Sequence, residues 1–194
     1  KKLMTLLLAA SLTLSLAACG GPAAPSASPS ASTSPSASTG AEPSAPAEIK
    51  YSQGASADKI LIANSAATSG AYAPVGVPFI AGIQAYLDMV NSGGGIDGRK
   101  IEFLHVDDEF DPVKGKAALQ NFVEDEKVFA IVGHFGTPVV GATIDDLKSY
   151  GIPSVYFATG IGQLYAEGAT TNEEGYNIFP VQPIYTTEGQ IMVA

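Results

Sequence analysis

Short apolar runs alternate with helix-length segments from about residue 59 onward, and this order constrains the fold more than any other feature of the chain. Four runs have the length and the β-branched or aromatic content of strands, namely 59–63, 101–106, 128–132 and 154–157. Helical patterns rather than tight turns separate them. The economical arrangement is therefore an α/β fold, in which a doubly wound parallel sheet has helices on both faces.

The three segments between these runs carry helix signals of their own. The first has one apolar stripe at helical spacing, and the glycines at 93–95 follow it as a stop. The stripe consists of Ile80, Ile83, Leu87 and Val90. The second helix is expected to begin at Asp111-Pro112, with Asp as N-cap and Pro as the first helical residue. Its inward-facing residues are expected to be Leu119, Phe122 and Val123. By the same signals, a third helix begins at Thr137-Pro138, with Thr137 as N-cap, and ends near Tyr150 before Gly151.

The start of the chain has the pattern of an export signal. Lys1 and Lys2 precede an apolar run over 3–16, and small residues then lead to Cys19. This pattern predicts a signal peptide over residues 1–18 and a lipid on Cys19, which would anchor the protein to the cell membrane on its outer side. The alternatives are a short transmembrane anchor or a buried structural thiol. Since no initiator Met is present and the end lies in an apolar stretch, we expect a sequence clipped at both ends.

Composition excludes some partners. Because Cys19 is the only cysteine, no internal disulfide can form, and packing must stabilise the fold. The formal net charge is −9, which disfavours nucleic acid, whose binding depends on Lys and Arg neutralising phosphates. It also disfavours anionic lipid surfaces, so any membrane attachment rests on the acyl chains of Cys19.

Residues 19–48 are rich in Ala, Ser and Pro, and they contain no apolar periodicity from which a core could be built. They are interpreted as a semi-extended, disordered tether, although filler without a selected length is an equal alternative. The expected organisation is a folded lobe over 49–181, followed by a crossover over 182–194. The last strand of that lobe is expected at 176–180, and a helix is expected from Thr186.

The candidate binding residues follow the expected strands. In open parallel sheets the crevice beyond the carboxyl ends of the strands collects free backbone donors and helix N-termini. The loops that meet there are expected to be 69–74, 107–110, 133–137 and 158–160. Thr137 would offer a hydroxyl beside unpaired N–H groups that favour an anion such as a carboxylate, and Thr159 would offer a second hydroxyl. The competing interpretations are an ordinary helix cap and an ordinary turn residue.

Together, the order and spacing of seven motifs resemble the first lobe of the branched-chain amino acid binding proteins, which belong to the type I periplasmic binding proteins. The motifs are Ser69-Gly70, residues 93–99, Asp107-Asp108, Asp111-Pro112, residues 133–137, Ile152-Pro153 and Ala158-Thr159. The resemblance implies a two-lobed clamshell whose second lobe is largely missing from this sequence. In that family the second lobe supplies a carboxylate for the ammonium group and a tyrosine that completes the cap.

The resemblance also implies a site. Thr137 stands where the family binds the substrate carboxylate, and Phe157, through its carbonyl, and Thr159 stand where the family binds with backbone and hydroxyl groups. The neighbouring Gly136, Pro138 and Ala158 complete the expected contacts. Val75 occupies the place of the aromatic residue that covers the ligand in many members, and Tyr72 is the candidate substitute. The segments 136–138 and 157–160 are also similar to relatives that bind amides or aromatic carboxylates.

The implied function is an extracytoplasmic receptor that captures a small carboxylate-bearing solute for an ABC importer. Its partners would be the permease subunits with their cytoplasmic ATPases, and no cofactor is expected. A receptor domain that passes ligand occupancy to a signalling partner is the alternative. An exported enzyme using Thr137 or His134 is a third, but no Ser/His/Asp or Cys/His constellation is visible, so we expect no enzyme.

Three features suggest other chemistry. Gly93, Gly95 and Gly98 fit G-x-G-x-x-G, but they follow a helix and precede a strand, so a tight turn is expected rather than a dinucleotide site. His105 and His134 lack metal-ligand spacing and are expected to be hydrogen-bonded strand residues, with no metal assigned. The acidic stretch 107–111 is expected to be a solvated loop with one helix cap, and Asp108 is kept as a candidate for binding a cation or an ammonium group.

Overall fold

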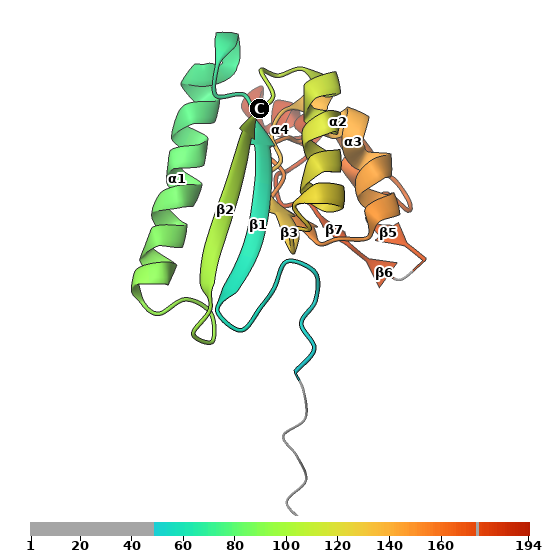
Figure 1. The fold of residues 1–194 in the computed structure, drawn as a ribbon. Helices are drawn as coiled ribbons and strands as arrows, with labels where there is room; N and C mark the ends of the chain where they lie inside the picture. Colours follow the sequence, from blue (N-terminus) through green and yellow to red (C-terminus); the bar gives the residue numbers. More distant parts are fainter. Residues whose placement is uncertain (1–48, 174) are drawn as a thin grey trace, which may run out of the picture. The chain divides into compact units, whose positions relative to one another are not determined.

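The computed structural model describes residues 49–173 and 175–194 (Figure 1). The predicted signal peptide, the lipidated Cys19 and the tether fall on residues 1–48, outside the described residues.

Five parallel strands form the main sheet, in the order β2-β1-β3-β4-β7. They are β1 (Lys59–Ala66), β2 (Lys100–Asp107), β3 (Ala130–Val132), β4 (Ser154–Val155) and β7 (Ile178–Phe179). The pairing of β1 with β2 is the longest and runs from Lys59 opposite Lys100 to Ala66 opposite Asp107. The prediction of a parallel α/β sheet is therefore confirmed, and all four expected strands are present.

Helices lie on both sides of this sheet. Figure 1 shows α1 (Ala73–Ser92) on one side, and α2 (Pro112–Gln120) with α3 (Thr137–Tyr150) on the other. A 3-10 turn, η1 (Gly70–Tyr72), precedes α1, and a π-helical turn, η2 (Asn121–Asp125), continues α2. The order of strands reverses at β1, which has β2 on one side and β3 on the other, so the sheet is doubly wound as expected.

Each helix has a local reason for its start and its end. The Asp111 carboxylate accepts hydrogen bonds from the N–H groups of Val113 at 2.7 Å and Lys114 at 3.1 Å, which confirms it as the N-cap of α2. Gly151, with φ at 70°, ends α3 as predicted. Gly93 follows the last residue of α1, also as predicted. However, α1 begins at Ala73, inside the segment expected to be a loop.

The predicted start of α3 is corrected. Thr137 is the first helical residue, and Gly136 is the N-cap, because the Gly136 carbonyl accepts the N–H of Val140 at 2.9 Å. The chain enters this helix with φ at 93° for residue 136, a conformation that glycine adopts without steric cost. Thr137 consequently makes no capping bond to its own helix, and its hydroxyl is directed elsewhere.

Two apolar clusters hold the layers together. The larger lies between the sheet and the pair α2 and α3, and Leu119, Phe122 and Val123 are buried in it as the sequence predicted. The smaller lies between the sheet and α1, where Ile62, Leu87 and Ala130 are buried. By length and composition alone, residues 70–92 would be long and apolar enough to span a membrane, and here Leu87 and Ile83 of this segment pack on the sheet.

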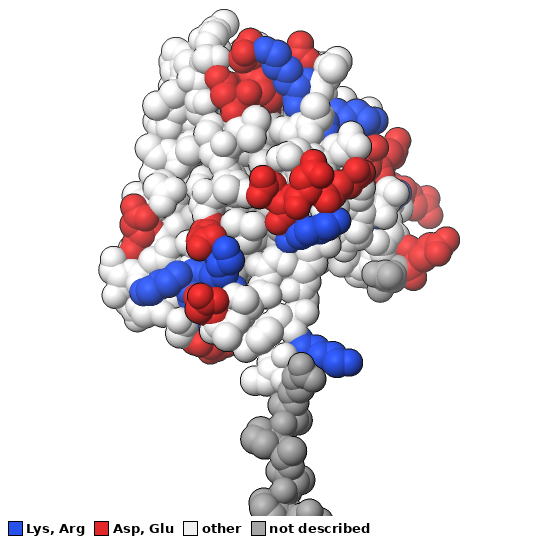
Figure 2. Space-filling model, viewed as in Figure 1, with Lys and Arg blue, Asp and Glu red and all other residues white. Residues whose placement is uncertain are grey.

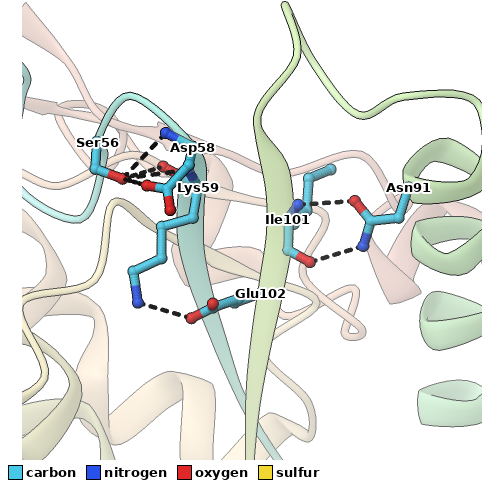
Figure 3. A network of polar contacts seen from close by, with 6 residues as sticks. All are labelled: Ser56, Asp58, Lys59, Asn91, Ile101 and Glu102. Carbon is cyan, nitrogen blue, oxygen red and sulfur yellow. Dashed lines mark hydrogen bonds and ion pairs between the residues drawn. The ribbon is translucent and has the colours of Figure 1, made fainter.

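Charged side chains are distributed unequally between the two helical layers (Figure 2). Figure 2 shows acidic side chains spread over the α2 and α3 side, whereas most of the surface over α1 is uncharged. At the β2 edge, the Asn91 side chain at the end of α1 exchanges two hydrogen bonds of 2.8 Å with the backbone of Ile101 (Figure 3). Lys59 and Glu102 form an ion pair at 2.9 Å across β1 and β2 (Figure 3). The helix end and the edge strand are thus joined by specific polar contacts.

The connection between α1 and β2 is a tight turn, as predicted for the glycines at 93, 95 and 98. A Cβ on Gly95 would lie 1.9 Å from the Arg99 carbonyl oxygen, so only glycine fits there. The Ile96 and Arg99 backbones exchange two hydrogen bonds, at 2.8 and 3.0 Å.

The last part of the lobe differs from expectation. The predicted strand 176–180 is divided between β6 (Gly175–Tyr176), which pairs antiparallel with β5 (Thr171–Asn172), and β7, which pairs with β4. Strand β4 also ends at Val155, because Tyr156 has φ at 58° and interrupts the regular pairing, which resumes only as a single parallel bridge between Ala158 and Phe135. A 3-10 turn, η3 (Gly162–Tyr165), follows, and α4 (Tyr185–Met192) begins close to the helix start expected at Thr186.

Candidate functional site

A cavity of about 580 Å³ lies at the carboxyl ends of the strands, where the crevice was expected. The loops after β1, β2, β3 and β4 all reach it, and the segment after β7 joins them. Its lining residues are Tyr72, Val75, Phe79, Phe110, Phe135, Gly136, Thr137, Tyr156, Phe157, Ala158, Val181, Gln182 and Tyr185. A cavity of this volume is in the range that accommodates small organic ligands.

Two threonine hydroxyls meet at this cavity. The Oγ1 atoms of Thr137 and Thr159 lie 2.9 Å apart, within hydrogen-bond distance. Thr137 is partly exposed and lines the cavity, whereas Thr159 is fully buried and lies behind it. The N–H of Ile161 donates to Thr159 Oγ1 at 3.3 Å. Thr159 is therefore fixed by the loop after β4 and in turn orients the hydroxyl of Thr137.

The start of α3 places a positive electrostatic potential beside the Thr137 hydroxyl. Thr137 is its first residue, and the helix continues for 14 residues, so its positive end borders the cavity. The backbone beside it is rigid. Ala158 donates its N–H to the His134 carbonyl at 2.9 Å, and its own carbonyl accepts the N–H of Gly136 at 3.3 Å. Thr137 is therefore held in place by both neighbouring strand ends.

The predicted site residues separate into two groups. Tyr72, Gly136, Thr137, Phe157 and Ala158 line the cavity together. The other two do not. Pro138 is exposed and serves as the second helical residue of α3, and Thr159 reaches the cavity only through Thr137. Neither Pro138 nor Thr159 therefore lines the cavity directly.

Tyr185 is a functional candidate that the sequence analysis missed. It lines the cavity, and its N–H donates to the Gly160 carbonyl at 2.9 Å. Burial raises the pKa of its hydroxyl, but hydrogen bonds with Thr159 and Thr137 act in the opposite direction and leave the pKa below its usual value. Tyr185 thus adds a third hydroxyl to the threonine pair. The signal that could have found Tyr185 is its place shortly after β7, the fifth strand of the sheet, in the segment 182–194 that was expected to be a crossover.

Aromatic side chains form another part of the cavity lining. Tyr72 and Phe110 stack with ring centroids 3.6 Å apart, and Phe110 meets Phe135 edge-on at 6.1 Å. Tyr72 was predicted from the sequence, but Phe110 was not, because the acidic residues around it suggested a solvated loop. The signal that could have found Phe110 is a single aromatic residue in the loop after β2, between Glu109 and Asp111.

The expectation that the acidic stretch 107–111 is a solvated loop is wrong for Asp108. Asp108 is fully buried, where it accepts hydrogen bonds from the Ser65 hydroxyl and from the Phe110 N–H, the latter at 2.9 Å. Burial raises the pKa of the Asp108 carboxyl. The Asp107 carboxylate accepts from the N–H groups of Thr68 and Glu109. Asp108 therefore shapes the loop from inside and does not line the cavity, whose described lining has no Asp, Glu, Lys or Arg.

The histidines are hydrogen-bonded residues of the sheet region, as predicted. His134 is buried and its Nε2 lies 2.9 Å from Thr143 Oγ1, and burial lowers its pKa to about 4. His105 lies 3.0 Å from both Asn64 Oδ1 and Thr68 Oγ1. Within residues 49–173 and 175–194, no group of three or more His, Cys, Asp or Glu side chains is placed to hold a metal ion.

The part of the chain that forms this fold matches a known protein family. Residues 59–194 match the family model described as periplasmic binding protein. The chain belongs to this periplasmic binding protein family. The relatives described next are named as amino acid binding, substrate-binding or solute-binding proteins.

Three relatives illustrate the family. An amino acid binding protein of Pseudomonas aeruginosa is 34% identical over 67 residues, which is 34% of this chain and 18% of that protein. The branched-chain amino acid transporter substrate-binding protein of Streptococcus pneumoniae, solved with isoleucine, has a TM-score of 0.55 at 26% identity and covers 66% of this chain and 34% of its own. A solute-binding protein of an ABC transporter from R. palustris, solved with benzoate, has a TM-score of 0.57 at 25% identity and covers 69% and 34%.

The same comparisons show how much of a periplasmic binding protein this chain spans. The chain spans about a third or less of the length of the relatives it matches. The described residues correspond to one lobe of the family fold.

Proposed function

We propose that this protein is a lipid-anchored, extracytoplasmic solute-binding protein of an ABC importer, and that this lobe binds the carboxylate of a small solute. The observation that carries the proposal is the pair of hydroxyls of Thr137 and Thr159, 2.9 Å apart at the start of α3 and beside an uncharged cavity. The relatives solved with isoleucine and with benzoate support a small carboxylate. Both solutes carry that group.

The physical basis is anion binding without a cationic side chain. Thr137 Oγ1 donates to a carboxylate oxygen, while Thr159 and Tyr185 hold the threonine in place. The positive end of α3 stabilises the negative charge. A solute held here and contacted by a second lobe stabilises the closed form by its greater affinity for that form, and the permease subunits would recognise the closed form.

The test uses the full-length protein from the complete gene. Amino acids, amides and aromatic acids are screened by thermal shift, since binding to the native state raises its melting temperature. The tightest ligand is then titrated calorimetrically against Thr137→Ala and Thr137→Ser. A hydrogen bond to a charged group contributes about 1.5–3 kcal/mol, so Thr137→Ala should weaken binding by about ten-fold to a hundred-fold.

Thr137→Ser keeps the hydroxyl and should stay within about three-fold of the original affinity. Ser149→Ala removes an exposed hydroxyl at the opposite end of the same helix and serves as the matched control. If Thr137→Ala binds the ligand as tightly as Ser149→Ala does, the carboxylate site is not at Thr137.

The lipid anchor has its own experiment. Cys19→Ala removes the thiol to which the lipid would be attached, so the protein should move from the membrane fraction to the soluble fraction. Mass spectrometry of the unchanged protein should find acyl chains on Cys19. A Cys19→Ala protein that stays in the membrane fraction would contradict the anchor and leave the solute site untouched.

A further inference from the structure

The cavity has an apolar side of unusual composition, which we call the aromatic wall. It consists of Tyr72, Phe79, Phe110, Phe135 and Tyr156, all of which line the cavity. The rings form a connected series: Tyr72 stacks on Phe110, Phe110 meets Phe135, Phe79 lies 5.8 Å from Phe135, and Phe79 lies 6.0 Å from Tyr156. The rings come from loops after four different strands and from α1, so no single element explains the pattern.

Phe110 is held in place between two other rings of this wall, Tyr72 and Phe135. Its backbone is left-handed, with φ at 65°, and its N–H donates to the buried Asp108 carboxylate at 2.9 Å. The ring lies against the backbone of Gly136, where a Cβ would come within 2.6 Å of the ring. Gly136 directly precedes Thr137, so the wall has a fixed distance from the carboxylate anchor.

Tyr72 is the more accessible member of the stacked pair. It lies on the short turn η1, its side chain is 45% exposed, and one face of its ring covers Phe110. The interplanar angle of 17° makes the two rings nearly parallel. Flat apolar groups pack well on surfaces of this kind, because aromatic rings favour offset stacked and edge-to-face contacts.

The uncharged lining disfavours a solute whose side group carries a charge. None of the described lining residues is Asp, Glu, Lys or Arg, so a charged side group on the solute would lose its water without gaining a partner on this side. We propose that the solute is an aryl carboxylate, whose ring lies on Tyr72 and Phe110 while its carboxylate binds Thr137. This inference rests on the proposed function and narrows it from small carboxylates to aromatic ones.

The test compares ring chemistry at constant size. Benzoate and cyclohexanecarboxylate carry the same anion on six-membered rings, and only benzoate is flat and aromatic. The full-length protein should bind benzoate about ten-fold more tightly, since an aromatic contact contributes about 0.5–1.5 kcal/mol beyond its area. Tyr72→Leu should bring this ratio within about three-fold, whereas Tyr72→Phe should keep it. Tyr51→Leu, which removes an exposed ring outside the cavity, is the matched control.

A spectroscopic readout checks ring contact directly. The fluorine signal of bound 4-fluorobenzoate should shift upfield through the ring currents of the wall, and the shift should shrink in Tyr72→Leu and Phe110→Leu. Unfolding curves show whether these variants are folded. Tyr72→Leu should be folded, because Tyr72 lies on an exposed turn.

Two failures can be told apart. If cyclohexanecarboxylate or isoleucine binds as tightly as benzoate, and Thr137→Ala still weakens the binding, the aromatic preference is wrong while the carboxylate site stands. If Thr137→Ala leaves every affinity unchanged, the proposed site falls, and the present inference falls with it.

Discussion

The hydroxyl oxygen of Thr137 lies 2.9 Å from that of Thr159, although the two residues are 22 positions apart in the chain. Each follows the end of a different strand, and neighbouring parallel strands place their carboxyl ends at the same edge of the sheet. Thr159 is buried, so its hydroxyl has few alternative partners and holds Thr137 in one orientation. Thr159 is therefore a positioning residue in the proposed site.

Thr159→Val should weaken the best ligand by about three-fold to ten-fold, because it preserves shape but removes one neutral hydrogen bond of about 0.5–1.5 kcal/mol. Thr159→Ser should restore most of the affinity. Calorimetric titration of both variants in the full-length protein measures the effect. A positioning role predicts that Thr159→Val has little further effect in a Thr137→Ala background, and additive losses would contradict it.

Stability should fall in acid through His134. Its pKa is about 4 in the folded protein against 6.5 for an exposed histidine, so protonation favours the unfolded chain. The contribution is complete above pH 6.5 and is lost as the pH falls toward 4. At pH 4.5 the loss is about 2.5 kcal/mol.

Urea unfolding at pH 7 and pH 4.5 measures this loss. Carboxyl groups titrate in the same interval, so the comparison is made against His134→Gln. That variant should be less stable at pH 7 and should lose about 2.5 kcal/mol less on acidification. Equal losses in the two proteins would show that His134 is not the group responsible.

Gly136→Ala should destabilise the protein by about 1–3 kcal/mol and weaken ligand binding. The residue has φ at 93°, and the new Cβ would come within 2.6 Å of the Phe110 ring. Gly82→Ala is the control, because it lies within α1 with no atom near the new Cβ. It should stabilise by about 0.5–1 kcal/mol. Thermal unfolding compares the two, and a neutral Gly136→Ala would argue against this entry into α3.

Asp111→Ala should cost about 1 kcal/mol of unfolding free energy, because two N–H groups at the start of α2 lose their acceptor. Asp111→Asn retains an acceptor oxygen and should recover most of the loss. Chemical denaturation gives both values. Since Asp111 does not line the cavity, neither change should alter ligand affinity by more than about two-fold.

The sequence predicted the layers well because these depend on periodic patterns. The alternation of strands and helices, the cap at Asp111 and the buried Phe122 all followed from local rules. The errors arise where distant segments decide. Gly136 displaces Thr137 as the N-cap because the Phe110 ring and the Ala158 backbone pack against residue 136. Asp108 is buried because Ser65, on another strand, supplies a partner.

The site was predicted to a similar depth. Thr137, Phe157, Ala158 and Tyr72 line the cavity, but whether they bind a solute stays a prediction. Tyr185 and Phe110 were missed because single-residue signals do not show which rings converge in space. No local pattern separates a buried hydroxyl such as Thr159 from one that faces the cavity.

The aromatic wall shares residues with a further apolar cluster at the carboxyl end of β1, in which Phe135 is buried with Ala66 and Ala67 while Phe79 and Phe110 pack against them. The same side chains therefore stabilise the fold and would determine the proposed preference for aromatic solutes. Most changes that remodel this surface for a new solute also remove packing at the sheet edge. Such proteins would diverge first at the exposed members Tyr72 and Tyr156, where a substitution removes less packing, and the inner rings would change only after stabilising substitutions elsewhere.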